Sequence, residues 1–235
     1  MKLTTEQINQ LYLFTRQHYV EYYDLQTELV DHLANSIETE WAQNPKLTFD
    51  EVLHKEFRKF GVFGFMDVVE KRQDVLGKKY NGLVWQHFKS FFKLPKILLT
   101  IVMTFLLFNI LKTSIYNDYI FIAICIIYFG FIFHEFYKNK KIKKAQKESN
   151  KKEWLFEEII NQYGVSSGAF SVPFYFFIQI SSRAERYLLN DYWIFSVSFM
   201  IVLFGILNYI LFRVIPSKAE AYLKQTYPEY KLENL

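Results

Sequence analysis

Two long apolar runs, residues 97–136 and 168–215, constrain this chain more than any other feature because they contain few charged residues. A membrane-crossing α-helix needs about 20 predominantly apolar residues, so each run can hold two such helices. Residues 1–90 are instead polar and patterned. The sequence therefore predicts an all-α integral membrane protein with a small N-terminal cytoplasmic helical domain and four transmembrane helices in two hairpins.

The boundaries follow from where charge and proline interrupt the apolar pattern. We expect four spans, over residues 96–116, 119–137, 168–182 and 192–215. The chain then divides into a cytoplasmic helical domain (1–80), an amphipathic interfacial linker (81–95), a first transmembrane hairpin (96–137), a basic cytoplasmic loop with an interfacial helix (138–167), a second transmembrane hairpin (168–215) and a cytoplasmic tail (216–235).

Lysine and arginine predict the orientation, because they accumulate in cytoplasmic loops. They are dense before the first span and between the second and third, whereas the opposite loops hold only Lys112, Arg183 and Arg186. The N-terminal "MKLTTEQINQ" also lacks the apolar core and cleavage site of a signal peptide. Both termini should therefore be cytoplasmic.

The N-terminal domain shows clear helix signals. Thr4 with Gln7, and Thr48 with Glu51, have the spacing of capping boxes that open helices. Asp24 should cap a second helix that ends near Trp41, with an apolar face formed by Leu25, Leu29, Val30, Leu33, Ile37 and Trp41. Gly61 should end the third helix, because glycine enters the left-handed region freely.

Glu28, Asp31 and His32 fall within one turn of that second helix, and Glu38 lies on the same side. A metal site would need further ligands from another element, and no spacing in the sequence supplies them. The trio is opposite the apolar stripe, which is typical of a solvated helix face. We therefore expect Glu28, Asp31, His32 and Glu38 to pair with basic residues of a neighbouring helix or to dock a basic partner surface, rather than to serve as metal or catalytic residues.

The other candidates are membrane-associated. The lysines of residues 138–152 act as a topology signal or bind anionic lipid headgroups; the candidates are Lys138, Lys140, Lys141, Lys143 and Lys144. Within the spans, Asn109, Gln179 and Asn208 are neutral polar groups suited to hydrogen bonds between helices. No charged relay lies mid-span, and no catalytic, phosphate-binding or dinucleotide motif occurs. The sequence therefore predicts no catalytic residue, no cofactor and no metal.

The stretches "YYDLQTELVDHLANSIE" and "NPKLTFDEVLHKEFRKFGVFGF" carry a resemblance. Residues 5–80 resemble the HAAS and permease-prefix type domains, cytoplasmic helical modules fused to bacterial membrane proteins. The pattern maps onto Glu28–Leu33 and onto Thr48–Gly61. The whole chain also resembles uncharacterised multi-span membrane proteins of Bacteroidetes-type bacteria. The resemblance implies a docking or regulatory module in the bacterial inner membrane, associated with transcriptional regulators of the PadR type or with permeases.

Three functions are compatible with these features. The first is a non-enzymatic multi-pass inner-membrane protein whose cytoplasmic module docks a protein partner, in a regulatory or scaffolding role. The second is an accessory or structural subunit held in a larger complex through its transmembrane helices. The third is a small transporter or channel, formed by a homo-oligomer. Expected partners are proteins of the cytoplasm or membrane, anionic lipid headgroups and a second copy of the chain, with no direct binding of nucleic acid.

Overall fold

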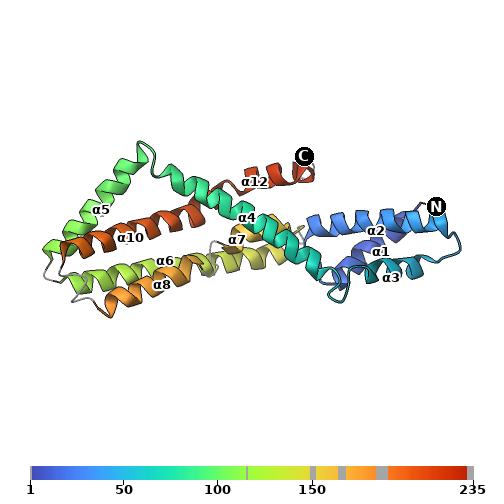
Figure 1. The fold of residues 1–235 in the computed structure, drawn as a ribbon, viewed down its shortest axis with the longest axis horizontal. Coiled ribbons are helices and arrows are strands. Elements are labelled where there is room, and N and C mark those ends of the chain that lie inside the picture. Colours follow the sequence, from blue (N-terminus) through green and yellow to red (C-terminus); the bar gives the residue numbers. More distant parts are fainter. Residues whose placement is uncertain (1, 115, 149–151, 164–167, 184–189, 232–235) are drawn as a thin grey trace. The chain divides into compact units, whose positions relative to one another are not determined.

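The computed structural model describes residues 2–114, 116–148, 152–163, 168–183 and 190–231 (Figure 1). Every regular element in these ranges is a helix, so the predicted all-α class is confirmed. The chain forms two compact units, each considered by itself. Unit 1 comprises the described parts of residues 1–79, 151–159 and 223–235, and unit 2 those of residues 80–150 and 160–222.

Three helices make up most of unit 1: α1 (Thr5–Gln17), α2 (Tyr23–Gln43) and α3 (Phe49–Arg58). Helix α2 packs against both α1 and α3, as Figure 1 shows. The apolar face predicted for α2 is confirmed, because Leu25, Leu29, Val30, Leu33, Ile37 and Trp41 are all buried. Leu11 of α1 and Val52 and Leu53 of α3 complete this core.

The starts of α1 and α3 follow from local chemistry. Thr4 and Thr48 are the N-caps, and each forms a complete capping box with Gln7 and Glu51 respectively, which confirms both predictions. The cap predicted for α2 is wrong. Its N-cap is Tyr22, which makes no side-chain cap bond, and Asp24 is a buried residue within the helix.

A tight turn joins α3 to α4 (Met66–Ser90). Helix α3 ends at Arg58 with Lys59 as its C-cap, so Gly61 is not the cap itself. Gly61 (φ +80°) and Gly64 (φ +56°) both have left-handed backbone conformations in the turn, which glycine adopts without steric cost. Helix α4 then continues through residues 81–90, where the sequence predicted a separate interfacial linker.

Unit 2 contains the long apolar helices α5 (Lys96–Thr113), α6 (Asn117–Glu148), α8 (Gly168–Ser181) and α10 (Asp191–Tyr209). Helix α5 packs on α10 and α6, and α8 packs on α6 and α10. Their shared core is apolar and aromatic; its buried members are Leu111, Phe121, Phe177, Ile180, Ile194, Val197 and Ile201.

Some of the four transmembrane helices predicted from the sequence have the length and composition to cross a membrane. In the described ranges, three helices are long and apolar enough to cross a membrane: Lys96–Thr113, Asp118–Ala145 and Asp191–Ser217. The last of these continues from α10 through η1, a π-helix (Ile210–Val214), into α11 (Ile215–Ser217). The apolar part of α8, Phe170–Ser181, is shorter than the others.

The region predicted as a basic loop, 138–167, is largely helical. Helix α6 runs on to Glu148, and α7 occupies Leu155–Tyr163, while residues 149–151 and 164–167 lie outside the described ranges. The sequence predicted that α7 lies on the membrane surface. In the structure Trp154, Leu155 and Phe156 are buried and belong to unit 1. Two short helices follow α11: α12 (Ala219–Thr226) and η2 (Pro228–Lys231).

Candidate functional site

A polar groove of about 450 Å³ lies between α2 and α3 of unit 1. Its lining contains no apolar residue: His32, Asn35, Ser36, Thr39, Glu40, Gln43, Glu56 and Lys59. The two helices pack through their apolar faces, and polar residues of both helices line the groove beside that contact. Hydroxyl, amide, imidazole and charged groups all open into it, so it offers many hydrogen-bond donors and acceptors.

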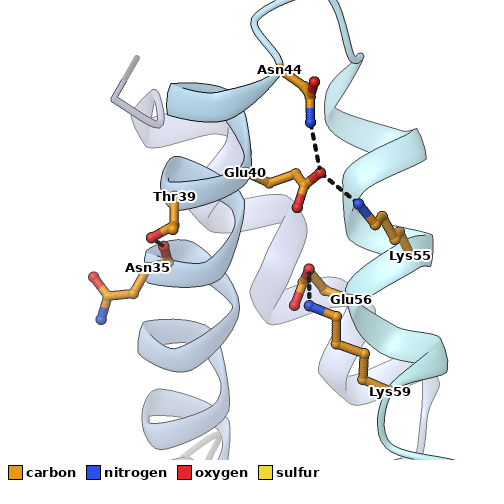
Figure 2. A network of polar contacts seen from close by, with 7 residues as sticks. All are labelled: Asn35, Thr39, Glu40, Asn44, Lys55, Glu56 and Lys59. Atoms are coloured by element: carbon orange, nitrogen blue, oxygen red, sulfur yellow. Dashed lines mark hydrogen bonds and ion pairs between the residues drawn. The ribbon is translucent and has the colours of Figure 1, made fainter.

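Two glutamate–lysine pairs organise the groove, as Figure 2 shows. The Glu40 carboxylate of α2 accepts from Lys55 Nζ of α3 at 2.5 Å and from Asn44 Nδ2 at 3.2 Å. Both hydrogen bonds lower the pKa of Glu40, and the bond from Lys55 has the larger effect. Glu56, which is buried, accepts from Lys59 Nζ at 2.6 Å. Both carboxylates therefore face lysines whose side chains are more than half exposed.

The four predicted docking residues lie on α2 but do not gather in one place. His32 lines the groove and its ring is 5.8 Å from that of Phe60. Glu28 is exposed, with its carboxylate 4.0 Å from the Arg72 guanidinium, and Asp31 is exposed. Glu38 is half-buried, and its carboxylate accepts from the backbone N–H of Leu3 at 3.0 Å. Of the four residues, only His32 lines the groove.

Sequence reasoning missed the rest of the groove, although a signal was present. His32, Ser36 and Glu40 repeat at four-residue spacing, with Asn35, Thr39 and Gln43 beside them, so they form a polar stripe along α2. The contribution of α3 could not be predicted, because it depends on how the two helices pack.

A second polar centre in unit 1 surrounds Asp24. Its Oδ1 accepts from the backbone N–H of Leu155 at 3.1 Å, and its Oδ2 accepts from the hydroxyl of Tyr227 at 2.7 Å. The same hydroxyl accepts from the backbone N–H of Phe156 at 3.2 Å. Trp154 packs on the rings of Tyr23 and Tyr227, with centroids 5.3 and 4.7 Å apart. This centre joins three segments that are far apart in the sequence.

Burial dominates the acid–base properties of this centre. It raises the pKa of Asp24, against the opposing effect of the hydrogen bonds from Tyr227 and Leu155. Burial, reinforced by the neighbouring Asp24, also raises the pKa of Tyr227. Tyr22 next to this centre has a pKa of about 12, chiefly through burial and then through Glu158. The hydroxyl of Tyr227 therefore stays protonated and keeps donating to Asp24.

The three interhelical candidates of unit 2 differ in their surroundings. Asn109 is exposed, and its amide donates to the carbonyl of Phe105 in its own helix at 3.0 Å. Gln179 is half-buried. Asn208 is buried, and its Oδ1 has no hydrogen-bond partner among the described residues.

Glu135 of α6 is an ionisable residue that the sequence pattern undervalued. It lies near the end of the second predicted span, and only 2% of it is exposed. Its Oε1 accepts from Arg213 Nη2 of η1 at 2.8 Å, and Lys138 Nζ lies 3.9 Å from its Oε2. The other lipid-facing candidates follow on the same helix; Lys140, Lys141 and Lys144 are exposed and Lys143 is half-buried.

In the described part of the chain, no group of three or more His, Cys, Asp or Glu side chains has an arrangement that could hold a metal ion. Glu28, Asp31 and His32 thus share a helix face without forming a ligand set. No protein-family model, curated protein or solved structure matches the chain.

Proposed function

We propose that this protein is a non-enzymatic membrane protein whose unit 1 docks a protein partner through the groove between α2 and α3. The observation that carries the proposal is that every residue lining the groove is polar or charged, with two carboxylates held in place by neighbouring lysines. On this proposal, residues 5–80 supply most of a docking module of the HAAS or permease-prefix type that they resemble.

The chemistry of the groove favours a basic partner. Lys55 and Lys59 are long, flexible and mostly exposed, so a competing cation can displace them at little cost. An arginine is the best competitor, because its planar guanidinium binds a carboxylate through two parallel hydrogen bonds. The amides and hydroxyls along α2 would then bind the polar backbone or side chains around that arginine.

Photocrosslinking in the native membrane tests this proposal. A photoreactive residue at Gln43, which lines the groove, should crosslink to a defined protein, whereas one at the neighbouring exposed Ala42 should not. Thr39→Arg should remove the crosslink by placing a cation in the groove. A crosslink of equal strength at both positions, or one that Thr39→Arg leaves intact, would refute groove docking.

The acidic residues of α2 outside the groove are tested separately. Reversing charge at Glu28 and Asp31 should leave binding intact if the groove alone docks the partner, and should abolish it if the exposed acidic face contributes. A partner that survives every unit 1 variant would instead support the second function, a subunit held through its apolar helices.

The proposed topology has four spans with both termini in the cytoplasm of a bacterial inner membrane. Three helices have the necessary length, and we assign the shorter helix α8 as the fourth span. At 14 residues α8 is about 21 Å long, shorter than the hydrocarbon core of about 30 Å. Arg183, just beyond its end, can reach the headgroups with its long side chain.

Thiol labelling of intact cells tests this topology, starting from Cys125→Ser, because Cys125 is the one cysteine of the chain. Single cysteines at Thr113 and Ser182 should react with a membrane-impermeant reagent. Cysteines at Lys46 and Lys141 should react only after permeabilisation. Labelling of the Lys46 position in intact cells would overturn the proposed orientation.

A further inference from the structure

The buried carboxylate of Glu135 holds two cations at one end of the apolar helices in unit 2. Arg213 binds its Oε1 at 2.8 Å, and Lys138, one turn further along α6, lies 3.9 Å from its Oε2. A buried charge persists only when it is paired, so the carboxylate fixes both cations near itself. One negative charge faces two positive ones, which leaves a net positive charge at this place.

Both cations remain accessible on their outer sides. The side chains of Lys138 and Arg213 are each 48% exposed, whereas that of Glu135 is 3% exposed. The guanidinium of Arg213 carries five N–H donors, and only Nη2 is engaged with Glu135 in the described contacts. The remaining donors, with the ammonium of Lys138, are suited to bind an oxyanion.

Arg213 lies in the π-helix η1, which interrupts the regular α-helix after Tyr209. A π-turn changes the direction of the side chains within it, and such turns are frequent at functional sites. Here Ile210, Leu211 and Phe212 remain buried while Arg213 extends to Glu135. The ring of Phe212 packs on that of Phe131, at 5.9 Å, which supports the site from α6.

The position of these residues along the helices matches the headgroup level of a bilayer. Glu135 is about 26 Å along the helix axis from Asp118, close to the hydrocarbon thickness of about 30 Å. The exposed aromatic residues Phe136, Tyr137 and Tyr209 lie at the same ends of these helices. Such residues mark membrane–water interfaces.

We propose that Glu135, Lys138 and Arg213 form a binding site for the phosphate group of an anionic phospholipid. Tetrahedral phosphate oxygens accept from the guanidinium and the ammonium together, and the buried carboxylate keeps both donors in position. The site differs from a diffuse lysine patch, because it uses an arginine distant in sequence and a carboxylate. It is independent of the docking groove and requires only that α6 and α10 cross the membrane.

Native mass spectrometry of the full chain in mild detergent tests the site, with phosphatidylglycerol, phosphatidylcholine and inorganic phosphate as probes. Phosphatidylglycerol should bind most tightly, and Lys138→Gln should weaken it by about five-fold, the effect typical of one basic residue at a lipid surface. The matched control is Lys141→Gln, which removes the same charge from an exposed position of the same helix and should have little effect.

Arg213→Gln alone would leave Glu135 buried without its partner, so the double variant Glu135→Gln/Arg213→Gln is the decisive test. It keeps the net charge of the protein unchanged and should still lose phosphatidylglycerol binding. Wild-type binding by the double variant, or equal losses in Lys138→Gln and Lys141→Gln, would overturn the proposal. Equally tight binding of phosphatidylcholine, or displacement of the lipid by inorganic phosphate, would overturn the assignment to an anionic lipid.

Discussion

Asp24 illustrates how much a single side chain can organise in this protein. It is a buried residue of α2 and accepts hydrogen bonds from Leu155 and Tyr227. A buried acceptor that loses its donor keeps its full desolvation penalty, so removing one partner costs more than a typical hydrogen bond contributes. The stability of unit 1 therefore depends on these bonds.

Tyr227→Phe should lower the free energy of unfolding of unit 1 by about 1–3 kcal/mol, because it leaves Asp24 Oδ2 without its donor. The loss should appear as a lower thermal midpoint in detergent, with Tyr19→Phe as control, since Tyr19 is 79% exposed. In a double-mutant cycle, Asp24→Asn and Tyr227→Phe should be strongly non-additive. Additive effects would mean that the two side chains do not act together.

Asp24 should also give unit 1 a characteristic pH dependence. Burial raises the pKa of Asp24 above its ordinary 3.8, so the folded state binds a proton at a higher pH than the unfolded state does. When the pH falls below the raised pKa and approaches 3.8, protonation of Asp24 therefore stabilises the folded state. When the pH rises again, Asp24 loses this proton and the stabilisation is lost. The unfolding midpoint of the wild type, relative to Asp24→Asn, should increase as the pH is lowered from neutral toward 3.8. A constant difference would contradict this expectation.

At the scale of elements, local sequence rules account well for unit 1. Both capping boxes and the apolar face of α2 could be predicted, because each depends on residues within a few positions of one another. The groove forms only where α2 and α3 pack side by side, so the sequence could indicate its polar residues on α2 but not those that α3 contributes. The cap predicted at Asp24 failed because tertiary partners 131 and 203 residues away bind that carboxylate instead.

The turn between α3 and α4 provides a test at this scale. Gly64→Ala should destabilise unit 1, because a Cβ at φ +56° would lie 2.9 Å from the ring of Phe57. Gly82→Ala is the matched control; it lies within α4, where no neighbouring atom is within 4 Å of the added Cβ. That variant should be neutral or more stable, by up to about 1 kcal/mol. Equal unfolding midpoints for the two variants would contradict this account of the turn.

At the scale of the whole molecule, unit 1 is assembled from three separate stretches of chain. Residues 152–159 and 223–231 contribute Leu155, Phe156, Leu223 and Tyr227 to its buried residues. The sequence indicated a self-contained domain over residues 1–80, because periodicity reports on segments one at a time. Which distant segments complete a core depends on tertiary packing, and no pattern within residues 1–80 records it.

A chain that ends at Tyr222 should therefore lose much of the structure of unit 1, although α1, α2 and α3 are intact in its sequence. Hydrogen exchange of the α2 amides in the purified full-length and shortened proteins would measure the loss. A chain that ends at Lys231 is the control, because it retains both Leu223 and Tyr227. Unchanged protection of α2 in the chain ending at Tyr222 would show that residues 1–80 are self-sufficient.

The bond between Asp24 and Tyr227 also sets the order of events during synthesis. The ribosome releases the N-terminal helices first, whereas the tyrosine that completes their core follows Asp24 by 203 residues. Closing a contact over such a separation is slow, and it cannot begin before Tyr227 has left the ribosome. Unit 1 thus reaches its final state only after Tyr227 has been translated, and a product that terminates before this residue would present an open core to the proteases that remove unfinished proteins.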